Sequence, residues 1–304
     1  MSLDNHNEER PKSESVSIHF GKTISKLDPC TEENEKGSKV WVDGKLYDLV
    51  VICDGGFSTL RKHVVMEGNG EPKYAGYVVW RGSVSVSELP NHILHDIEEG
   101  VYKNGIFDTI VLKMAKDNGE DLWTMGTFVA TPEDEISMYW NKERDGKSRH
   151  KVQHTKKPPR SVPEWFLPHF ETYFYDVPGL VPLVKYMMER GEITPHPQYE
   201  FGADRVHNGR ILILGDAAHM ASPRTAVGAH TAILDALALR QALATHPDDV
   251  DKAIQLYSES AVERAQELYA RTRQISQQFL PPGGIDHVVS PSTILRTTTK
   301  RNDG

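Results

Sequence analysis

The sequence predicts an α/β (α+β) fold in which an antiparallel sheet interrupts a smaller set of parallel strands and a long helix follows. Two apolar runs, at residues 46–53 and 210–214, each end in a turn made of aspartate and glycine, as buried strands of an α/β sheet do. Between them, residues 74–140 carry strand-like runs separated by Gly, Pro and charged residues. Residues 248–279 follow a helical pattern that a Pro-Pro-Gly sequence stops.

Composition and charge exclude several classes of protein. The chain has 304 residues, of which 38% are hydrophobic, so it is long enough to bury a substantial core. Its formal net charge of −8 argues against binding to nucleic acid or an anionic membrane, and its apolar runs fall short of the ~18 to 20 residues that span a bilayer. The two cysteines, Cys30 and Cys53, suit neither a disulfide framework nor a metal site. We therefore expect a cytoplasmic protein.

The first part of the chain predicts a tail, a hairpin-like pair and a buried strand. Residues 1–14 are expected to be disordered because they carry almost no apolar side chains. Residues 15–20 alternate like a strand, and residues 39–42 resume this pattern before a turn at Asp43-Gly44. The run at 46–53 is interpreted as one buried strand.

The middle of the chain predicts a second unit. A short helix at residues 58–65 leads into an antiparallel sheet of about four strands, an estimate based on usual strand lengths. The strands are expected at residues 74–86, 107–115, 122–130 and 135–140. A basic stretch at 141–163 predicts a surface loop without the aromatic residues of a nucleic-acid site. Helices are expected at residues 163–175 and 180–190.

The last part of the chain returns to strands followed by helices. A strand at 210–214 precedes a helix of small apolar residues at 230–244, which should pack closely on a sheet. One face of the long helix at 248–279 is expected to be buried, with Ile254, Tyr257, Ala261, Ala265 and Leu268. Residues 281–304 are expected to form a flexible tail.

The first segment that carries chemistry runs from Asp54 to Arg61 and reads Asp-Gly-Gly-Phe-Ser-Thr-Leu-Arg. A strand that ends in Asp-Gly places a carboxylate and a flexible backbone at the carboxyl edge of a sheet, where α/β proteins bind their ligands. Asp-Gly is also the composition of an ordinary turn. Taken alone, the segment leaves both interpretations open.

The second segment runs from Gly209 to Ala236 and contains Gly-Asp-Ala-Ala-His after a strand, then a Pro-containing loop and a small-residue helix. Asp216 can accept hydrogen bonds from the hydroxyl groups of a polyol, and amides near Gly228 can face negative charge on a ring. A ligand site and an ordinary strand–helix turn are both compatible with this spacing.

Together the two segments resemble the flavoprotein monooxygenases of the para-hydroxybenzoate hydroxylase type. In that family the first segment has the pattern Asp-Gly, two residues, Ser, two residues, Arg, which residues 54–61 match completely. The second segment fits in order at Gly209, Arg210, Gly215, Asp216, Ala217, Ala218, His219, Pro223, Gly228, Asp235 and Ala236. Residues 74–82 further resemble the middle domain of the 2,6-dihydroxypyridine 3-monooxygenase branch.

The resemblance implies an FAD-dependent enzyme that uses NADH or NADPH to hydroxylate a small aromatic or N-heterocyclic substrate. It implies an incomplete FAD-binding Rossmann-like domain at residues 15–70 and 195–280, interrupted by a substrate-binding domain at residues 71–194. The alternative is a non-catalytic binding or interaction protein that keeps this scaffold without FAD.

The resemblance also implies roles for individual residues. Pro223 would lie beside the isoalloxazine ring and Gly228 at its pyrimidine edge, which makes these two the catalytic candidates. Of the other cofactor-binding candidates, Asp54 and Gly55 would line the phosphate region and Asp216 would bind the ribityl chain. The remaining cofactor-binding candidates are Arg61, Gly215 and Ala217.

The chain departs from the family's pattern in two respects. The family begins with a Gly-x-Gly-x-x-Gly turn between a strand and a helix, which holds the FAD pyrophosphate, and this sequence contains none. The turn after Pro223 has Ala226 and His230 where the family has Gly and Asn. We therefore expect a truncated form, one piece of a split protein or a degenerate relative, whose partner is a missing N-terminal FAD-binding segment or a second copy in a homo-oligomer.

Other residues allow two interpretations each. Tyr77, Trp80 and Arg81 either line an aromatic substrate pocket, with Arg81 pairing with an anionic ring substituent, or belong to a strand that packs a core. His219 is either a proton-transfer group or, as we favour, a structural histidine. Cys53 is expected to be a buried strand residue, and His196 part of a loop.

Overall fold

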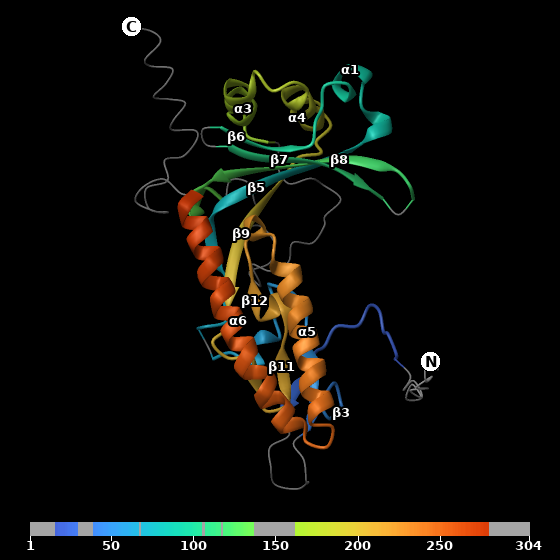
Figure 1. Cartoon of the computed structure of the whole chain (residues 1–304), viewed down its shortest axis with the longest axis vertical. Helices are drawn as coiled ribbons and strands as arrows, with labels where there is room; N and C mark the ends of the chain where they lie inside the picture. Colours follow the sequence, from blue (N-terminus) through green and yellow to red (C-terminus); the bar gives the residue numbers. More distant parts are fainter. Residues whose placement is uncertain are drawn as a thin grey trace, which may run out of the picture.

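The computed structural model describes residues 16–29, 39–66, 68–104, 107–116, 118–136 and 162–279. The larger part of a six-stranded antiparallel sheet crosses the upper part of the molecule in Figure 1, with helices above it and a narrower unit of strands and helices below it. The α/β (α+β) prediction is confirmed. No helix of the described ranges is both long enough and apolar enough to cross a membrane.

The six-stranded sheet contains the strands that the sequence predicts in the middle of the chain. Its order is β12-β9-β5-β8-β7-β6. The strands are β5 (Lys73–Ser85), β6 (Gly100–Asn104), β7 (Phe107–Ala115), β8 (Asp121–Ala130), β9 (Thr194–Gly202) and β12 (His219–Met220). The prediction of a strand at residues 135–140 is wrong at its first residue, because a 3-10 turn spans Glu133–Glu135. Residues 137–140 lie outside the described residues.

The upper face of this sheet is covered by α1 (Asn91–Leu94), α3 (Phe166–Phe174) and α4 (Leu180–Glu189). The aromatic rings of α3 repeat every four residues, so they stack along one face of the helix. Phe166 packs on Trp80 of β5 with ring centroids 5.5 Å apart, and Phe170 packs on Phe107 of β7 at the same distance. These rings form the upper core.

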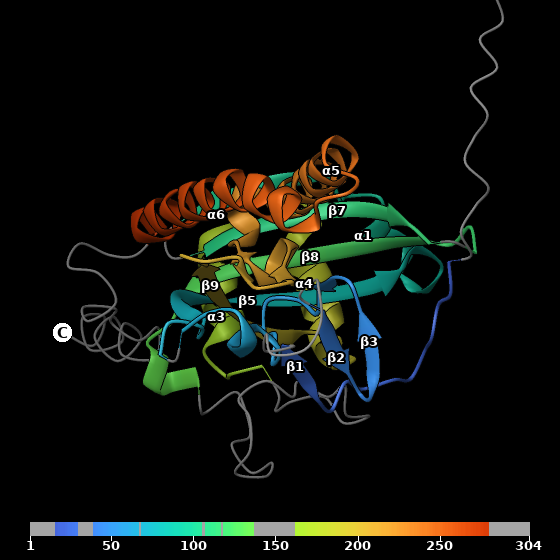
Figure 2. The same cartoon turned by 90° about the horizontal axis from the view of Figure 1, so that it is seen from below.

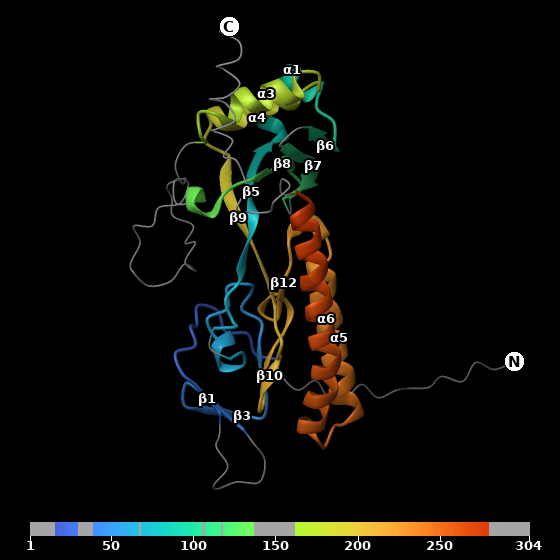
Figure 3. The same ribbon diagram turned by 90° about the vertical axis from the view of Figure 1, so that its left-hand side faces the viewer.

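The long strand β9 joins the sheet to the lower unit, as Figure 3 shows. It contains His196, so the expectation of a loop at that residue is wrong. The two flanking prolines are tolerated because β9 pairs on one side only with β5 there, whereas its second neighbour, β12, pairs with Phe201 and Gly202.

The lower unit has three layers, which Figures 2 and 3 show from two directions. One outer layer is the antiparallel sheet β1 (Leu27–Pro29), β2 (Val40–Val42) and β3 (Lys45–Tyr47). The middle layer is the sheet β10 (His207–Asn208), β11 (Ile211–Ile213) and β4 (Val50–Ile52), in which β11 and β4 are parallel. The other outer layer consists of α5 (Gly228–Thr245) and α6 (Val250–Phe279).

The N-terminal expectations need correction. Residues 16–19 form no strand, and Val16 and Phe20 are each 90% exposed, because an alternating pattern forms a strand only where another strand pairs with it. Residues 40–42 pair instead with β1 on one side and β3 on the other. The turn at Asp43-Gly44 is confirmed, with the positive φ of 46° and 80° that a tight hairpin requires.

The single strand expected at 46–53 is also wrong, because the chain bends at Asp48 and divides the run between β3 and β4, which belong to different sheets. Cys53 is exposed rather than buried, since β4 is an edge strand that ends at Ile52. The helix expected at 58–65 is reduced to a single 3-10 turn at Arg61–His63.

The two long helices match the sequence predictions closely. Helix α6 begins after Asp249, whose carboxylate accepts the amide N–H of Lys252 at 3.0 Å. All residues of the predicted inward face of α6 are buried: Ile254, Tyr257, Ala261, Ala265 and Leu268. This face packs on the middle sheet and brings α6 alongside α5.

Candidate functional site

The two sequence segments meet at one edge of the middle sheet. Strands β4 and β11 run parallel with Ile52 opposite Ile213, and the amide of Leu214 donates to the carbonyl of Ile52 at 3.0 Å. Because parallel strands end at the same edge, the turns that hold Asp54 and Asp216 lie side by side. Both aspartates are exposed at this edge.

Arg61 ties the two turns together from the inside. Its guanidinium, 1% exposed, donates to the carbonyl of Gly56 at 2.6 Å, to that of Gly70 at 2.8 Å and to that of Ala217 at 2.7 Å. Burial lowers the pKa of Arg61 to about 10, so the side chain is charged at neutral pH. The structure therefore places this predicted cofactor contact beneath the surface, where it connects the first segment to the second.

The rest of the first segment supports this connection. Ser58 Oγ accepts the amide N–H of Arg61 at 3.0 Å and so orients the 3-10 turn. Gly55 has a φ of +90°, which favours glycine. A Cβ on Gly56 would lie 2.5 Å from the Sδ of Met220, so only glycine lets the first turn approach β12 without displacing that side chain. The spacing of the first segment is explained by contacts within the protein.

The second turn presents Asp216 and buries its neighbours. Gly215 has a φ of +62°, and an added Cβ would lie 3.2 Å from the Cβ of Ala232 on α5. Ala217 is fully buried in the lower core. Of the three cofactor-binding candidates in this turn, only the side chain of Asp216 faces solvent, while Gly215 and Ala217 are buried and set its position.

A buried aspartate behind this turn was not assigned a role from the sequence, although it belongs to the second segment. Asp235 Oδ2 accepts the Gly215 amide at 3.2 Å and bonds His219 Nε2 at 2.7 Å, and its Oδ1 accepts Arg264 Nε at 2.9 Å. Burial alone would raise the pKa of Asp235, but the hydrogen bonds and charges of these partners outweigh burial and lower it. His219 is fully buried against Asp235, an arrangement typical of a structural histidine.

The turn around Pro223 follows β12 and contacts β5, β7 and α6. A 3-10 turn spans Pro223–Thr225, and Ala226 follows with a left-handed φ of 54°, a conformation that favours the glycine of the family pattern. Gly228 then begins α5, and Val227 before it supplies no side-chain cap. The first amides of this 18-residue helix therefore have no side-chain cap, and amides at a helix N-terminus are chemically suited to a negatively charged or polar group.

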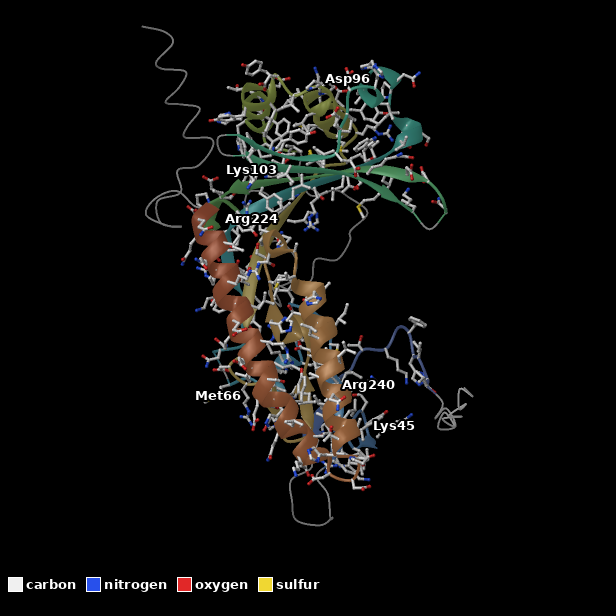
Figure 4. The ribbon with its side chains drawn as sticks, in the orientation of Figure 1. Lys45, Met66, Asp96, Lys103, Arg224 and Arg240 are labelled. Carbon is white, nitrogen blue, oxygen red and sulfur yellow. The ribbon has the colours of Figure 1, made fainter. Side chains whose placement is uncertain are left out.

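This turn is fastened to the underside of the six-stranded sheet, where Figure 4 labels Arg224. Ser222 Oγ and the Tyr77 hydroxyl share a short hydrogen bond. The guanidinium of Arg224 pairs with Asp108 of β7 and lies 5.1 Å from the ring centroid of Phe128 on β8. The turn and the sheet face thus form one continuous surface.

The three predicted substrate contacts do not come together. Strand side chains alternate between faces, so Tyr77 and Arg81 point to the lower face and Trp80 points to the upper face. Tyr77 reaches the Pro223 turn and Arg81 is exposed, whereas Trp80 is buried against Phe166. A recess on the other side of the sheet, lined by Tyr175, Val177 and Pro178 among others, contains none of the predicted site residues.

Comparison with known proteins finds relatives that are named as monooxygenases and hydroxylases. The chain is 26% identical to 3-amino-4-hydroxybenzoate 2-monooxygenase of Streptomyces cremeus over 84% of this chain and 57% of the relative. It is 28% identical to the FAD-dependent urate hydroxylase of Mycolicibacterium vanbaalenii over 75% of this chain and 50% of the relative. The chain therefore spans about half the length of these curated relatives.

Solved structures share the fold. 2,6-Dihydroxypyridine-3-hydroxylase from Arthrobacter nicotinovorans has a TM-score of 0.62 at 19% identity and covers 86% of this chain, which in turn covers 66% of that protein. Klebsiella pneumoniae HpxO in complex with FAD and uric acid has a TM-score of 0.57 at 18% identity, with 93% of this chain and 63% of that protein covered. The family described as FAD binding domain matches residues 47–272, which include both segments, and the chain belongs to this family.

Proposed function

We propose that this chain forms part of an FAD- and NAD(P)H-dependent monooxygenase that hydroxylates a small aromatic or N-heterocyclic molecule. One observation carries the proposal: Asp54 and Asp216 stand at the same sheet edge, joined by buried Arg61, as the family's two cofactor segments require. The relatives with related names, hydroxybenzoate and urate hydroxylases, support it. From its cysteine content we assign the protein to the cytoplasm.

The residues at this edge suit FAD in their chemistry. The exposed carboxylate of Asp216 can accept hydrogen bonds from the ribityl hydroxyls, and the uncapped amides at Gly228 can face the polar edge of the ring. Pro223 gives the ring a rigid apolar neighbour. Bound FAD supplies the redox chemistry, with NADH or NADPH as reductant and oxygen as oxidant. The protein binds the cofactor, orients it and excludes water.

We place the substrate on the lower face of the six-stranded sheet, beside the Pro223 turn. The partly exposed Arg224 lies there beside the buried rings of Tyr77 and Phe128, and Arg81 is exposed on the same face. Aromatic rings and guanidinium groups are suited to a flat substrate with an anionic or strongly polar substituent. Trp80 has no part in this proposal because it lies on the opposite face.

Asp216→Ala tests the cofactor assignment. We expect FAD to bind at least about tenfold more weakly, since hydrogen bonds to a charged group contribute about 1.5 to 3 kcal/mol. The measurement is a titration of flavin fluorescence with the full chain. Asp176→Ala, at an exposed aspartate between α3 and α4, is the matched control and should leave FAD affinity unchanged.

Two results would count against the assignment in different ways. Equal FAD affinity in Asp216→Ala and the control would mean that the carboxylate is not a cofactor contact. A wild-type chain that leaves flavin fluorescence untouched at every concentration, even after an FAD-binding segment from a relative is added, would favour the alternative, a non-catalytic interaction protein on the same scaffold.

We further infer that the free edge of β4 pairs with a strand supplied by a separate FAD-binding segment or by a second copy of the chain. The amide of Val50 bonds the carbonyl of Arg210, and the carbonyl of Ile52 accepts the amide of Leu214, so the backbone groups of Val51 point to the opposite edge. In the described part of the chain no strand pairs with that edge. The outer face of α5 is apolar as well, with Ile233 59% and Leu237 52% exposed.

These features suit a strand-plus-helix unit, because parallel strands are normally paired on both sides and covered by helices. The relatives' greater length supports a missing FAD-binding segment of this kind. A homo-oligomer joined through the same edge is the other candidate, and the next experiment separates the two.

Val51→Pro removes an amide that points to the free edge, and we expect it to lower the free energy of unfolding by less than about 1 kcal/mol. Val50→Pro is the matched comparison: it deletes the bond to Arg210 and should cost about 2 kcal/mol or more. Both are measured by urea denaturation. Equal losses would mean that the edge is already paired. A wild-type dimer that Val51→Pro converts to a monomer would identify the homo-oligomer.

A further inference from the structure

A buried carboxylate on β9 lies behind the Pro223 turn. Glu200 is fully buried, and three residues of a single stretch of α6 donate to it. Thr272 Oγ1 donates to Glu200 Oε1 at 3.2 Å and Ser276 Oγ donates to the same oxygen through a short bond, while Arg273 Nη1 donates to Oε2 at 3.1 Å. A buried charge is stable only when it is paired and hydrogen-bonded in this way.

The hydroxyl of Thr272 connects this carboxylate to the site. Thr272 Oγ1 also accepts the amide N–H of Ser222 at 2.8 Å. A carboxylate can only accept hydrogen bonds, so the one proton of the hydroxyl points at Glu200 and its lone pairs remain for Ser222. The charge on Glu200 therefore sets the direction of both bonds.

Ser222 is the residue immediately before Pro223, and it is held at three of its groups. Its amide is bound by Thr272, and its Oγ bonds the Tyr77 hydroxyl and accepts the Arg224 amide at 3.3 Å. Its carbonyl accepts Thr225 Oγ1 at 2.8 Å. Burial raises the pKa of Tyr77 to about 12, so this hydroxyl keeps its proton at neutral pH.

We propose that Glu200 is a positioning residue for the Pro223 turn and acts through Thr272 and Ser222. The ion pair with Arg273 would by itself tie β9 to α6. The additional bond through Thr272 extends that tie to the turn, and Tyr77 holds the same serine from the six-stranded sheet. Through this set of bonds three separate elements fix one residue next to Pro223. The role of Pro223 beside the cofactor rests on the proposed function, whereas the coupling of Glu200 to Ser222 does not.

The test compares Thr272→Val, which keeps the shape but removes the hydroxyl, with Thr272→Ser, which keeps the hydroxyl. The readout is amide hydrogen exchange of Ser222 and Arg224 in the full chain without flavin, with urea denaturation recording global stability. We expect exchange at these two amides to become at least tenfold faster in Thr272→Val and to stay at the wild-type rate in Thr272→Ser. Glu200→Gln should resemble Thr272→Val, because an amide can donate to Thr272 and release the fixed direction of its hydroxyl.

Gln266→Ala is the matched control. Gln266 on α6 donates to the carbonyls of Gly202, at 3.2 Å, and Ala203, at 2.8 Å, so this change loosens α6 near the end of β9 without touching Ser222. The control should lower global stability, but exchange at the Ser222 amide should accelerate by no more than that loss of stability accounts for. If exchange at Ser222 follows global stability equally in every variant, Glu200 merely holds α6 and the proposal is overturned. Since no flavin is present, this failure is distinct from a failure to bind FAD.

Discussion

Arg61→Ala is expected to lower the free energy of unfolding by about 4 kcal/mol, which is among the largest effects of a single substitution. The guanidinium is 1% exposed and donates to the carbonyls of Gly56, Gly70 and Ala217. Its removal leaves these carbonyls without their donor and opens a cavity beside Phe201, over whose ring the guanidinium lies at 4.0 Å. The two turns that carry Asp54 and Asp216 lose their common anchor.

Urea denaturation measures the loss as a shift of the midpoint at constant slope. Lys62→Ala, at the exposed neighbour, should change stability by less than about 0.5 kcal/mol. Arg61→Lys should recover only part of the loss, because one ammonium group cannot reach carbonyls that diverge around a planar guanidinium. Full recovery by lysine would mean that charge alone, rather than the fork of donors, holds the turns together.

The sequence predicts long periodic elements best, because many of their side chains contact the core. Helix α6 places every residue of its predicted apolar face in the core, because a 30-residue helix repeats its pattern over several turns. Residues 15–20 alternate as clearly, yet no described strand pairs with residues 16–20. A strand depends on a neighbour that local pattern does not reveal, and short runs such as 46–53 can be divided between two sheets.

The site was predicted in part, and the missing parts have physical reasons. The two segments do meet, but sequence could not reveal that Arg61 points inward, since its burial depends in part on the carbonyl of Ala217, which is distant in the chain. The sequence does indicate that Trp80 and Tyr77 lie apart, because residues three apart on a strand lie on opposite faces. Asp235 is a polar residue at a helical position that the sequence leaves unexplained until His219 and Arg264 are seen around it.

Asp235→Asn is expected to lower the free energy of unfolding by about 3 kcal/mol at neutral pH. The carboxylate accepts from Gly215, His219 and Arg264 on both of its oxygens. An asparagine of the same shape must turn its NH₂ group toward at least one of these donors, so a donor then faces a donor. The substitution also removes the negative charge on α5 that pairs with Arg264 of α6. Because Gly215 precedes Asp216, FAD affinity should fall as well.

The pH dependence gives this prediction a second measurement. The folded-state pKa of Asp235 is lowered, so its ionisation stabilises the fold above the unfolded value of about 3.9 and this contribution is lost as pH falls through the folded value. The difference in stability between wild type and Asp235→Asn should therefore be largest near neutral pH and should shrink in acid. Glu259→Gln, at an exposed position of α6, should show neither the loss nor the pH dependence. A difference that stays constant down to acid pH would mean that the shape of the side chain, rather than its charge, supports the turn that presents Asp216.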